Sequence, residues 1–208
     1  MRSISLFLAA ALAAAPILAQ ESDALVAPTE ISKADFFKPG IAPVRAGKRY
    51  DLTVVYFMDY ACPQCRRYTP DVERVMREDS RIRWIYRDVP SISPHSRTAA
   101  RVAIAASFQN RHHAFHAALM TSKGQLTPAT IREAGIKAGL DWKRIDRDVT
   151  SRRSAIDDQI DRNIELATAT GLYATPAFII GDRQADGALE YKDLKAEIAD
   201  ARRAARKR

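Results

Sequence analysis

Apolar and polar residues follow one another along this chain in blocks that predict strands and helices in a definite order. Residues 51–60, DLTVVYFMDY, form a β-branched and aromatic run that is typical of a buried strand. Residues 62–79 place apolar side chains at helical spacing, and residues 81–89 are again rich in strand-forming side chains. The order strand, helix, strand implies a parallel pair joined by a right-handed crossover.

The section from residue 96 to residue 170 is predicted to be a series of helices. Its first part is rich in alanine, and Thr127 followed by Pro128 is typical of a helix N-terminus. Residues 141–171 are predicted to be one helix that Gly171 closes. This part of the chain shows little strand character.

The C-terminal part is predicted to contain a hairpin and a closing helix. Residues 177–180, AFII, predict a short strand that ends in a Gly-Asp turn. We place a second edge strand near residues 187–190 and the final helix at residues 191–208.

The N-terminus has the layout of a secretory signal. Arg2 precedes an apolar run, and Pro16 and small residues follow it, so we expect residues 1–19 to be cleaved after Ala19. A membrane anchor is the alternative, but the apolar stretch is shorter than the roughly 20 residues of a spanning helix. Residues 20–50 are interpreted as an extended leader, with one helical turn near residues 32–37. Export of this kind predicts a periplasmic protein in an oxidising compartment.

Composition and charge indicate a single globular domain and argue against a nucleic-acid-binding protein. The 208 residues are 47% hydrophobic, which is enough for one domain with a core, predicted here at residues 51–208. The formal net charge is +8, but most basic residues are interspersed with acidic ones, and no aromatic-basic recognition motif is present. We therefore expect no nucleic-acid partner, and we interpret the basic run at residues 202–208 as a solvated helix end.

The two cysteines of the chain, Cys62 and Cys65, are separated only by Pro63 and Gln64. A disulfide that closes so short a loop stabilises a fold little, because it removes little entropy from the unfolded chain. A zinc site would need two more ligands, and the candidates are His112 and His116, one helical turn apart. That metal-binding module stays open as an alternative, although we expect residues 112–116 to form a helix surface with Phe115 turned inward.

Redox chemistry explains the position of the pair best. The free N–H groups and the dipole of a helix N-terminus favour negative charge, so a thiolate at Cys62 is stabilised there. Cys65 lies one turn inside the helix, where it can attack a mixed disulfide formed at Cys62, and Pro63 stiffens the turn. Arg66 and Arg67 are expected to be solvated.

A second signal lies far downstream, where Thr175 and Pro176 come directly before the predicted strand. Proline suits neither a central strand nor a helix interior, whereas a cis-proline at the start of a strand fits this position. The combination of a CxxC between strand and helix with a Thr-Pro before the hairpin is a specific joint pattern.

With these motifs the sequence resembles the DsbA-like thiol:disulfide oxidoreductases of the thioredoxin superfamily. The resemblance runs from about residue 51 to residue 200, through VVYFMDYACPQC, SPHSRTAARVAIAA, FHAALM, LDWKRI and GLYATPAFIIGDR. It implies an α/β thioredoxin-like fold, with a multi-helix insertion at about residues 96–170 between the N-terminal strand-helix-strand and the C-terminal hairpin and helix. That insertion forms part of the substrate groove in the family.

The resemblance also implies roles for individual residues. Cys62 would be the nucleophile and Cys65 the resolving cysteine, paired with it in a disulfide, and no cofactor beyond this redox-active pair would be needed. Thr175 and Pro176 would flank the disulfide and bind the substrate backbone. Pro63 and Gln64 would tune the redox potential.

Two departures from the family pattern bear on this reading. Many relatives carry a buried acid six residues before the first cysteine, where this chain has Tyr56. Asp59 lies closer to the cysteines, and we assign it a surface or capping role. Gln64 replaces the histidine of the strongest oxidases and carries no positive charge, so we expect a less depressed Cys62 pKa and a less oxidising couple.

The function expected from the sequence is protein thiol–disulfide exchange, with disulfide donation to exported, cysteine-containing clients as the leading direction. The alternative is an isomerase or reductase kept reduced by a membrane partner, and Thr175 before the proline favours it. The short leader favours a monomeric oxidase. The membrane redox partner would accordingly be of DsbB or DsbD type.

Overall fold

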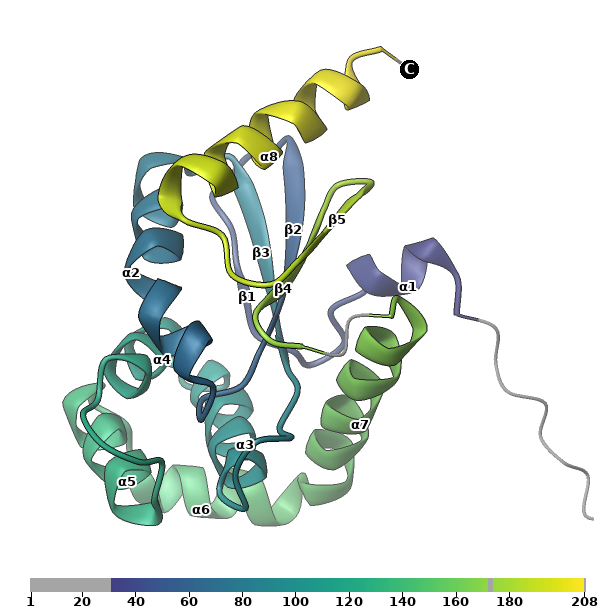
Figure 1. Cartoon of the computed structure of the whole chain (residues 1–208). Coiled ribbons are helices and arrows are strands. Elements are labelled where there is room, and N and C mark those ends of the chain that lie inside the picture. The colour runs from purple at the N-terminus through teal and green to yellow at the C-terminus, as the bar shows by residue number, and fades with distance from the viewer. Residues whose placement is uncertain (1–30, 172–173, 208) are drawn as a thin grey trace, which may run out of the picture. The chain divides into compact units, whose positions relative to one another are not determined.

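A computed structural model describes residues 31–171 and 174–207 (Figure 1). The predicted signal peptide and the first part of the leader lie outside the described residues. Within those ranges, none of the helices has the length and the apolar character that crossing a membrane requires.

The described residues form a five-stranded mixed sheet at the centre of the fold. Its strands, in spatial order, are β1 (Val44–Arg45), β3 (Ile82–Asp88), β2 (Leu52–Met58), β4 (Ala177–Ile180) and β5 (Arg183–Asp186). The central strands β2 and β3 run parallel, and every other neighbouring pair is antiparallel. The parallel pair and the hairpin β4–β5 confirm the strand order predicted from the sequence, to which the short edge strand β1 is an addition.

Helices cover both faces of this sheet. They are α1 (Lys33–Phe37), α2 (Pro63–Glu78), α3 (Ser96–Ser107), α4 (His112–Met120), α5 (Pro128–Lys137), α6 (Trp142–Ser151), α7 (Arg153–Ala169) and α8 (Tyr191–Ala205). Helices α3 to α7 occupy the region predicted as the helical insertion, and α1 corresponds to the predicted helical turn in the leader.

The two faces of the sheet bury different sets of side chains. Alternate residues of β2, among them Val54, Tyr56 and Met58, belong to a core cluster that also contains both cysteines and residues of α2, α4 and α8. Val55 and Phe57 point to the other face and pack with residues of α1 and α7. A run buried on both faces is expected of a central parallel strand, and here it separates the cysteine side from the α1–α7 side.

A buried arginine ties the α1–α7 side together. Arg87 of β3 is 1% exposed, and its guanidinium donates hydrogen bonds to Asn163 Oδ1 of α7 at 3.0 Å. It also donates to the carbonyls of Phe36 at 3.3 Å and Lys38 at 2.6 Å. The segment around α1 is thereby fastened to the sheet through hydrogen bonds to a charged donor, which are stronger than those between neutral groups.

Two predicted boundaries were wrong. The return strand lies at residues 183–186 and not at 187–190, because Gly181 adopts a positive φ of 57° and reverses the chain at once, so that Ile180 pairs with Arg183. The helix predicted at 141–171 breaks at Arg152. Ile145 before the break packs in the core on the cysteine side, whereas Ile160 after it packs against α3 in a separate cluster, so the break lets both faces be buried.

Candidate active site

The cysteine pair lies where β2 passes into α2. Cys62 is the N-cap of α2, Pro63 occupies the first helical position, and Cys62 Sγ accepts a hydrogen bond from the Cys65 N–H at 3.3 Å. An N-cap side chain that accepts from the third helical N–H satisfies one of the free donors of the helix end. The sulfur of Cys62 therefore takes the place that Ser or Asp fills at most helix starts, and both cysteines are free thiols.

The fold brings the predicted Thr-Pro segment to the same place. The peptide bond between Thr175 and Pro176 is cis, as the sequence predicts. Cys62 Sγ lies 3.0 Å from the carbonyl oxygen of Thr175, to which the thiol donates a hydrogen bond across a sequence separation of 113 residues. Residues from opposite ends of the domain thus form the surroundings of one sulfur atom.

The two thiols of the pair differ in acidity. Hydrogen bonds lower the pKa of Cys62 to about 6, most strongly the one from the Cys65 thiol, against the opposing effect of burial. The Thr175 side chain and the backbone N–H groups of Cys65 and Gln64 add to the effect. Burial raises the pKa of Cys65, which is 0% exposed. At neutral pH the pair therefore has one thiolate and one protonated thiol, which are the states that a nucleophile and a resolving thiol require.

The alkylation of Cys62 is expected to reveal this lowered pKa. In the reduced protein its rate with iodoacetamide should rise to half its plateau near pH 6, against about 8.5 for an ordinary cysteine. Cys65→Ala should move the midpoint upward most, and Thr175→Val less, because each removes a hydrogen bond to the thiolate. Mass spectrometry would give the rate for each cysteine, and a midpoint near pH 8.5 in the unsubstituted protein would contradict the assignment.

Gln64 and Pro63 surround the pair without covering it. Both side chains are exposed, and Gln64 affects Cys62 through its backbone N–H. The Cys62 pKa is therefore lowered by backbone groups and neighbouring hydroxyl and thiol donors. The tuning roles predicted for these two side chains stay predictions.

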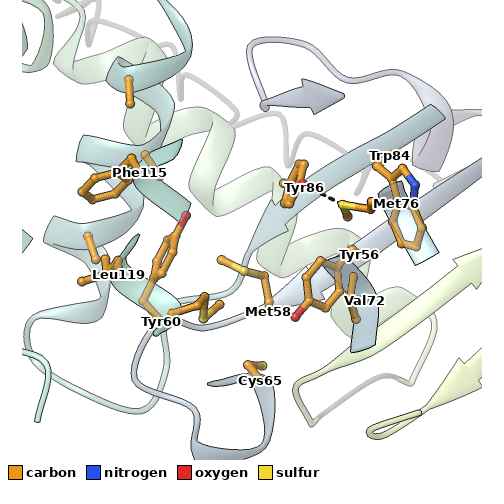
Figure 2. Close-up of a cluster of buried hydrophobic side chains, with 14 of the residues drawn as sticks. Tyr56, Met58, Tyr60, Cys65, Val72, Met76, Trp84, Tyr86, Phe115 and Leu119 are labelled. Atoms are coloured by element: carbon orange, nitrogen blue, oxygen red, sulfur yellow. Dashed lines mark hydrogen bonds between the residues drawn. The ribbon is translucent and has the colours of Figure 1, made fainter. Parts of the chain in front are cut away.

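Tyr56 occupies the position of the buried acid beneath the cysteines. It is 1% exposed, and its ring stacks on Phe178 with centroids 5.0 Å apart. Figure 2 shows the ring between Met58 and Val72, with its hydroxyl oxygen turned toward the side on which Cys65 lies. Burial, and then the neighbouring Cys65, raise the pKa of this phenol far above its usual range. Tyr56 therefore stays neutral and cannot act as the base that a carboxylate provides at this position.

Asp59 caps the loop that follows β3. It is 1% exposed, so the surface role was wrong and the capping role is confirmed. Its Oδ1 accepts hydrogen bonds from the Ala61 N–H at 2.8 Å and the Ser96 hydroxyl at 2.7 Å. Its Oδ2 accepts from the N–H groups of Ser91 at 2.9 Å and Ile92 at 3.0 Å. One carboxylate thus joins the cysteine loop to the segment between β3 and α3.

The histidines of α4 do not lie on its surface as predicted. His112 and His116 are 7% and 1% exposed, and both pack edge-on against the ring of Tyr86, with centroids 4.5 and 5.0 Å away. Burial lowers the pKa of both imidazoles, so they are neutral. The prediction failed because it treated histidine as a charged or hydrated side chain. A neutral imidazole can instead pack edge-on against aromatic rings in a core.

The metal-binding alternative gains no support from this arrangement. Within the described residues no group of three or more His, Cys, Asp or Glu side chains comes together in a geometry that could hold a metal ion. His112 and His116 face the aromatic core, and the fold does not assemble them with Cys62 and Cys65 into a ligand set.

Asp88 is a buried acid that sequence reasoning missed. It ends β3 opposite Met58 of β2, and it is 1% exposed with neither carboxylate oxygen hydrogen bonded within the described residues. Burial, followed by the nearby charge of Asp59, raises its pKa well above the usual range. The only signal in the sequence was an acid within a run otherwise typical of a buried strand.

Replacing Asp88 with asparagine is expected to stabilise the fold at alkaline pH. The pKa of Asp88 is higher in the folded than in the unfolded chain, so its contribution is most favourable below about pH 4 and is lost as the pH rises. Asparagine cannot ionise, and we expect a gain of about 1–3 kcal/mol at pH 8 that shrinks toward pH 4. Urea unfolding at both pH values measures it; an equal difference at both would show that the charge is not the cause.

A thiolate at the N-cap of the helix, a buried second thiol and a cis-proline beside them, on a sheet with one parallel central pair, define a dithiol-exchange site on a thioredoxin-like fold. A family model described as thioredoxin matches residues 48–200. The chain belongs to the thioredoxin family, and its neighbours among solved structures are DsbA-like thiol:disulfide oxidoreductases, which confirms the resemblance and the fold class expected from the sequence.

Solved structures similar to this chain come from several bacteria. A thioredoxin-like oxidoreductase from Silicibacter pomeroyi is 32% identical with a TM-score of 0.77, covering 83% of this chain and 99% of that one. A periplasmic thioredoxin-like protein from Salmonella enterica serovar Typhimurium is 28% identical with a TM-score of 0.71, covering 84% and 99%. The thiol-disulfide exchange protein alpha-DsbA2 from Wolbachia pipientis is 25% identical with a TM-score of 0.75, covering 81% and 90%.

Curated relatives are much longer proteins. The match to the Na(+)/H(+) antiporter NhaA 1 of Salinispora arenicola is 28% identical over 160 residues, 76% of this chain but 24% of the antiporter. The NhaA antiporter of Herminiimonas arsenicoxydans is 27% identical, with 81% of this chain and 27% of the antiporter covered. The chain spans about a quarter of the length of the curated relatives it matches, so the antiport in their names is not transferred to it.

Proposed function

We propose that the chain catalyses protein thiol–disulfide exchange through Cys62 and Cys65, and that its oxidised form donates the disulfide to exported proteins in the periplasm. The observation that carries the proposal is the site around Cys62: an N-cap sulfur with a pKa near 6, next to a buried thiol of raised pKa. The periplasm is supported by the signal-like N-terminus and by the name of the Salmonella relative.

The exchange proceeds in two steps that balance sulfur bonds and electrons. A client thiolate attacks Sγ of Cys62 in the Cys62–Cys65 disulfide, and Cys65 leaves and takes up a proton, as its raised pKa favours. The second client thiolate then attacks the client sulfur of the mixed disulfide, and Cys62 leaves as a stabilised thiolate. Two electrons pass from the client to the cysteine pair, and a membrane partner of DsbB type reoxidises it.

The direction of exchange follows from the acidity of Cys62. A stabilised thiolate makes the reduced form favourable and the disulfide oxidising. The side chain of Gln64 adds no positive charge, so we expect the redox potential of the cysteine pair to be lower than that of the strongest oxidases. Clients are exported proteins with cysteines, the chain acts as a monomer, and no cofactor takes part.

The alternative direction rests on one contact. The Thr175 side chain hydrogen bonds to the sulfurs of both cysteines, which helps to lower the pKa of Cys62 and partly opposes the rise that burial causes in the pKa of Cys65. A hydroxyl that serves both thiols of the reduced pair supports an isomerase or reductase, which a membrane partner of DsbD type would keep reduced.

The redox equilibrium of the purified protein with glutathione tests the proposal. Thiol trapping across a series of ratios of reduced to oxidised glutathione gives the redox potential at which half of the protein is reduced. We expect this potential to lie between roughly −120 and −200 mV. A potential below that window would favour the isomerase or reductase. A potential near −120 mV would support donation and show that Gln64 does not weaken the couple. No exchange, with Cys62→Ser as the matched blank, would contradict the enzyme assignment.

A further inference from the structure

A cavity lies beside the loop that carries the reacting cysteine. It has a volume of about 510 Å³ and is enclosed by the cysteine loop, the segment between β3 and α3, and the segment between α4 and α5. Ala61 and Pro63, the residues on either side of Cys62, line it. Cys62 itself is only 3% exposed, so a client that reaches its sulfur must lie against these surroundings.

Several apolar side chains and one arginine line the cavity, and no carboxylate of the described residues does. Ile92, Pro94 and Leu126 face it together with the cysteine loop, and its charged or titratable lining residues are Arg66 and His95. Ile92 is 50% exposed, which is unusual for a large aliphatic side chain in this fold. Apolar surface left exposed beside a reactive group is favourable to cover, and a cationic side chain entering here would meet like charge.

Arg66 fastens one wall of this cavity. Its guanidinium donates hydrogen bonds to the carbonyls of Gly124 at 2.6 Å and Leu119 at 3.3 Å. It also donates to the carbonyl of Ser122 at 2.9 Å and to its hydroxyl at 2.5 Å. These bonds fasten the α4–α5 segment, the outer wall of the cavity, to the first turn of α2. The expectation that Arg66 is solvated was therefore wrong.

The client residue beside the reacting cysteine falls within reach of this cavity. Neighbouring residues of a chain are about 3.8 Å apart, so a client cysteine that meets Cys62 places an adjacent side chain over Ala61 or Pro63. One side of Cys62 is taken by the backbone of Thr175. The cavity is on the side of Ala61, Pro63 and Arg66, where the surface is concave.

We propose that this cavity is a subsite for the client residue adjacent to its reacting cysteine, that it takes an apolar side chain and disfavours lysine or arginine, and that Arg66 is the positioning residue that shapes it. The inference rests on the proposed function, which it deepens by naming the class of client sequence. Specificity arises because covering the apolar walls with an apolar side chain removes them from water, which is favourable. A lysine or arginine side chain buried beside Arg66 would have no anionic partner.

Three reduced peptides test the subsite. They differ only in the residue next to the cysteine, which is leucine, glutamine or lysine, and each is reacted with the oxidised full chain under rapid acid quench. Each rate constant is divided by the rate constant of the same protein with glutathione. We expect leucine to react about tenfold faster than lysine, with glutamine between them. Equal values for the three peptides would overturn the proposal.

Two variants and a control separate the subsite from general damage. Arg66→Met should reduce the leucine-to-lysine ratio to about twofold, because the α4–α5 wall is released, and Arg66→Lys should restore part of it. Arg67→Met is the matched control, since Arg67 is exposed and lies over Tyr68, and it should keep the full ratio. An unchanged ratio in Arg66→Met would exclude the positioning role.

A further variant tests the subsite without depending on Arg66, and the reaction with glutathione tests the proposed function separately. Ile92→Lys at the exposed mouth places a cation at the cavity without disturbing the core, and it should increase the discrimination against the lysine peptide at least threefold even if Arg66→Met fails to fold. An unchanged ratio in that variant would overturn the subsite. If the unsubstituted protein does not react with glutathione at all, the proposed function fails, and this outcome differs from normal glutathione exchange with equal peptide rates.

Discussion

Cys65→Ser is expected to turn the reduced chain into one that captures a disulfide-bearing client and does not release it. Cys62 keeps a hydrogen-bonded sulfur at the N-cap of α2 and still attacks, but the thiol that lies one turn inside the helix is absent. Release by an intramolecular thiol benefits from a very high effective concentration, so its loss should slow resolution by about a thousandfold or more. The mixed disulfide should accumulate and be visible on a non-reducing gel.

The matched variant Cys62→Ser separates the two roles. It should form no adduct, because the remaining thiol is buried and its pKa is raised. An adduct in Cys62→Ser that equals the one in Cys65→Ser would show that the assignment of nucleophile and resolving cysteine is wrong. The identity of the bonded cysteine follows from peptide mapping of the adduct.

Asp59→Ala is expected to cause the largest loss of stability. The substitution removes the acceptor of four hydrogen bonds and leaves the N–H groups of Ala61, Ser91 and Ile92 without their partner. An orphaned buried donor costs about 1–3 kcal/mol, but these N–H groups are only part-buried and water can reach them, so we expect a loss of about 2–4 kcal/mol in the free energy of unfolding. Equilibrium urea unfolding measures it.

Asn at the same position is the matched control for Asp59→Ala. Its single amide oxygen can serve one of the two donor pairs, so Asp59→Asn should lose about half as much. A loss below about 1 kcal/mol in Asp59→Ala would show that the loop finds other acceptors. Because the capped segment also lines the cavity beside Cys62, Asp59→Ala should weaken client discrimination even where the protein still folds.

Local patterns in the sequence were sufficient to predict much of the site. Cys62 as the N-cap of a helix follows from the run of strand residues before it and the helical spacing after it. The cis-proline at Pro176 follows from the conflict between proline and the strand that it precedes. Both signals depend only on neighbouring residues, so they can be interpreted without knowledge of the tertiary structure.

Long-range contacts determined what the sequence did not reveal. Arg66 bonds to carbonyls 53 to 58 residues away, and nothing next to it in the chain marks those partners. The exposed or buried state of His116 depends on Tyr60, in the loop after β2, and on Tyr86 in β3, which are distant from it in the sequence. The burial of Asp88 was missed for a similar reason. An acid at the end of a strand usually marks the start of an exposed loop, and only the tertiary packing places this one in the interior.

The anchoring of the first helix by Arg87 determines how this domain can be attached to something else. Phe36 and Lys38 are fastened on the face of the sheet opposite the cysteine face. A linker or support joined just before Ile31 would therefore pull on that opposite face and leave the opening beside Cys62 unobstructed. An immobilised or fused form of the domain should accordingly be built through its N-terminal side, whereas a bulky attachment in the α4–α5 segment would block clients.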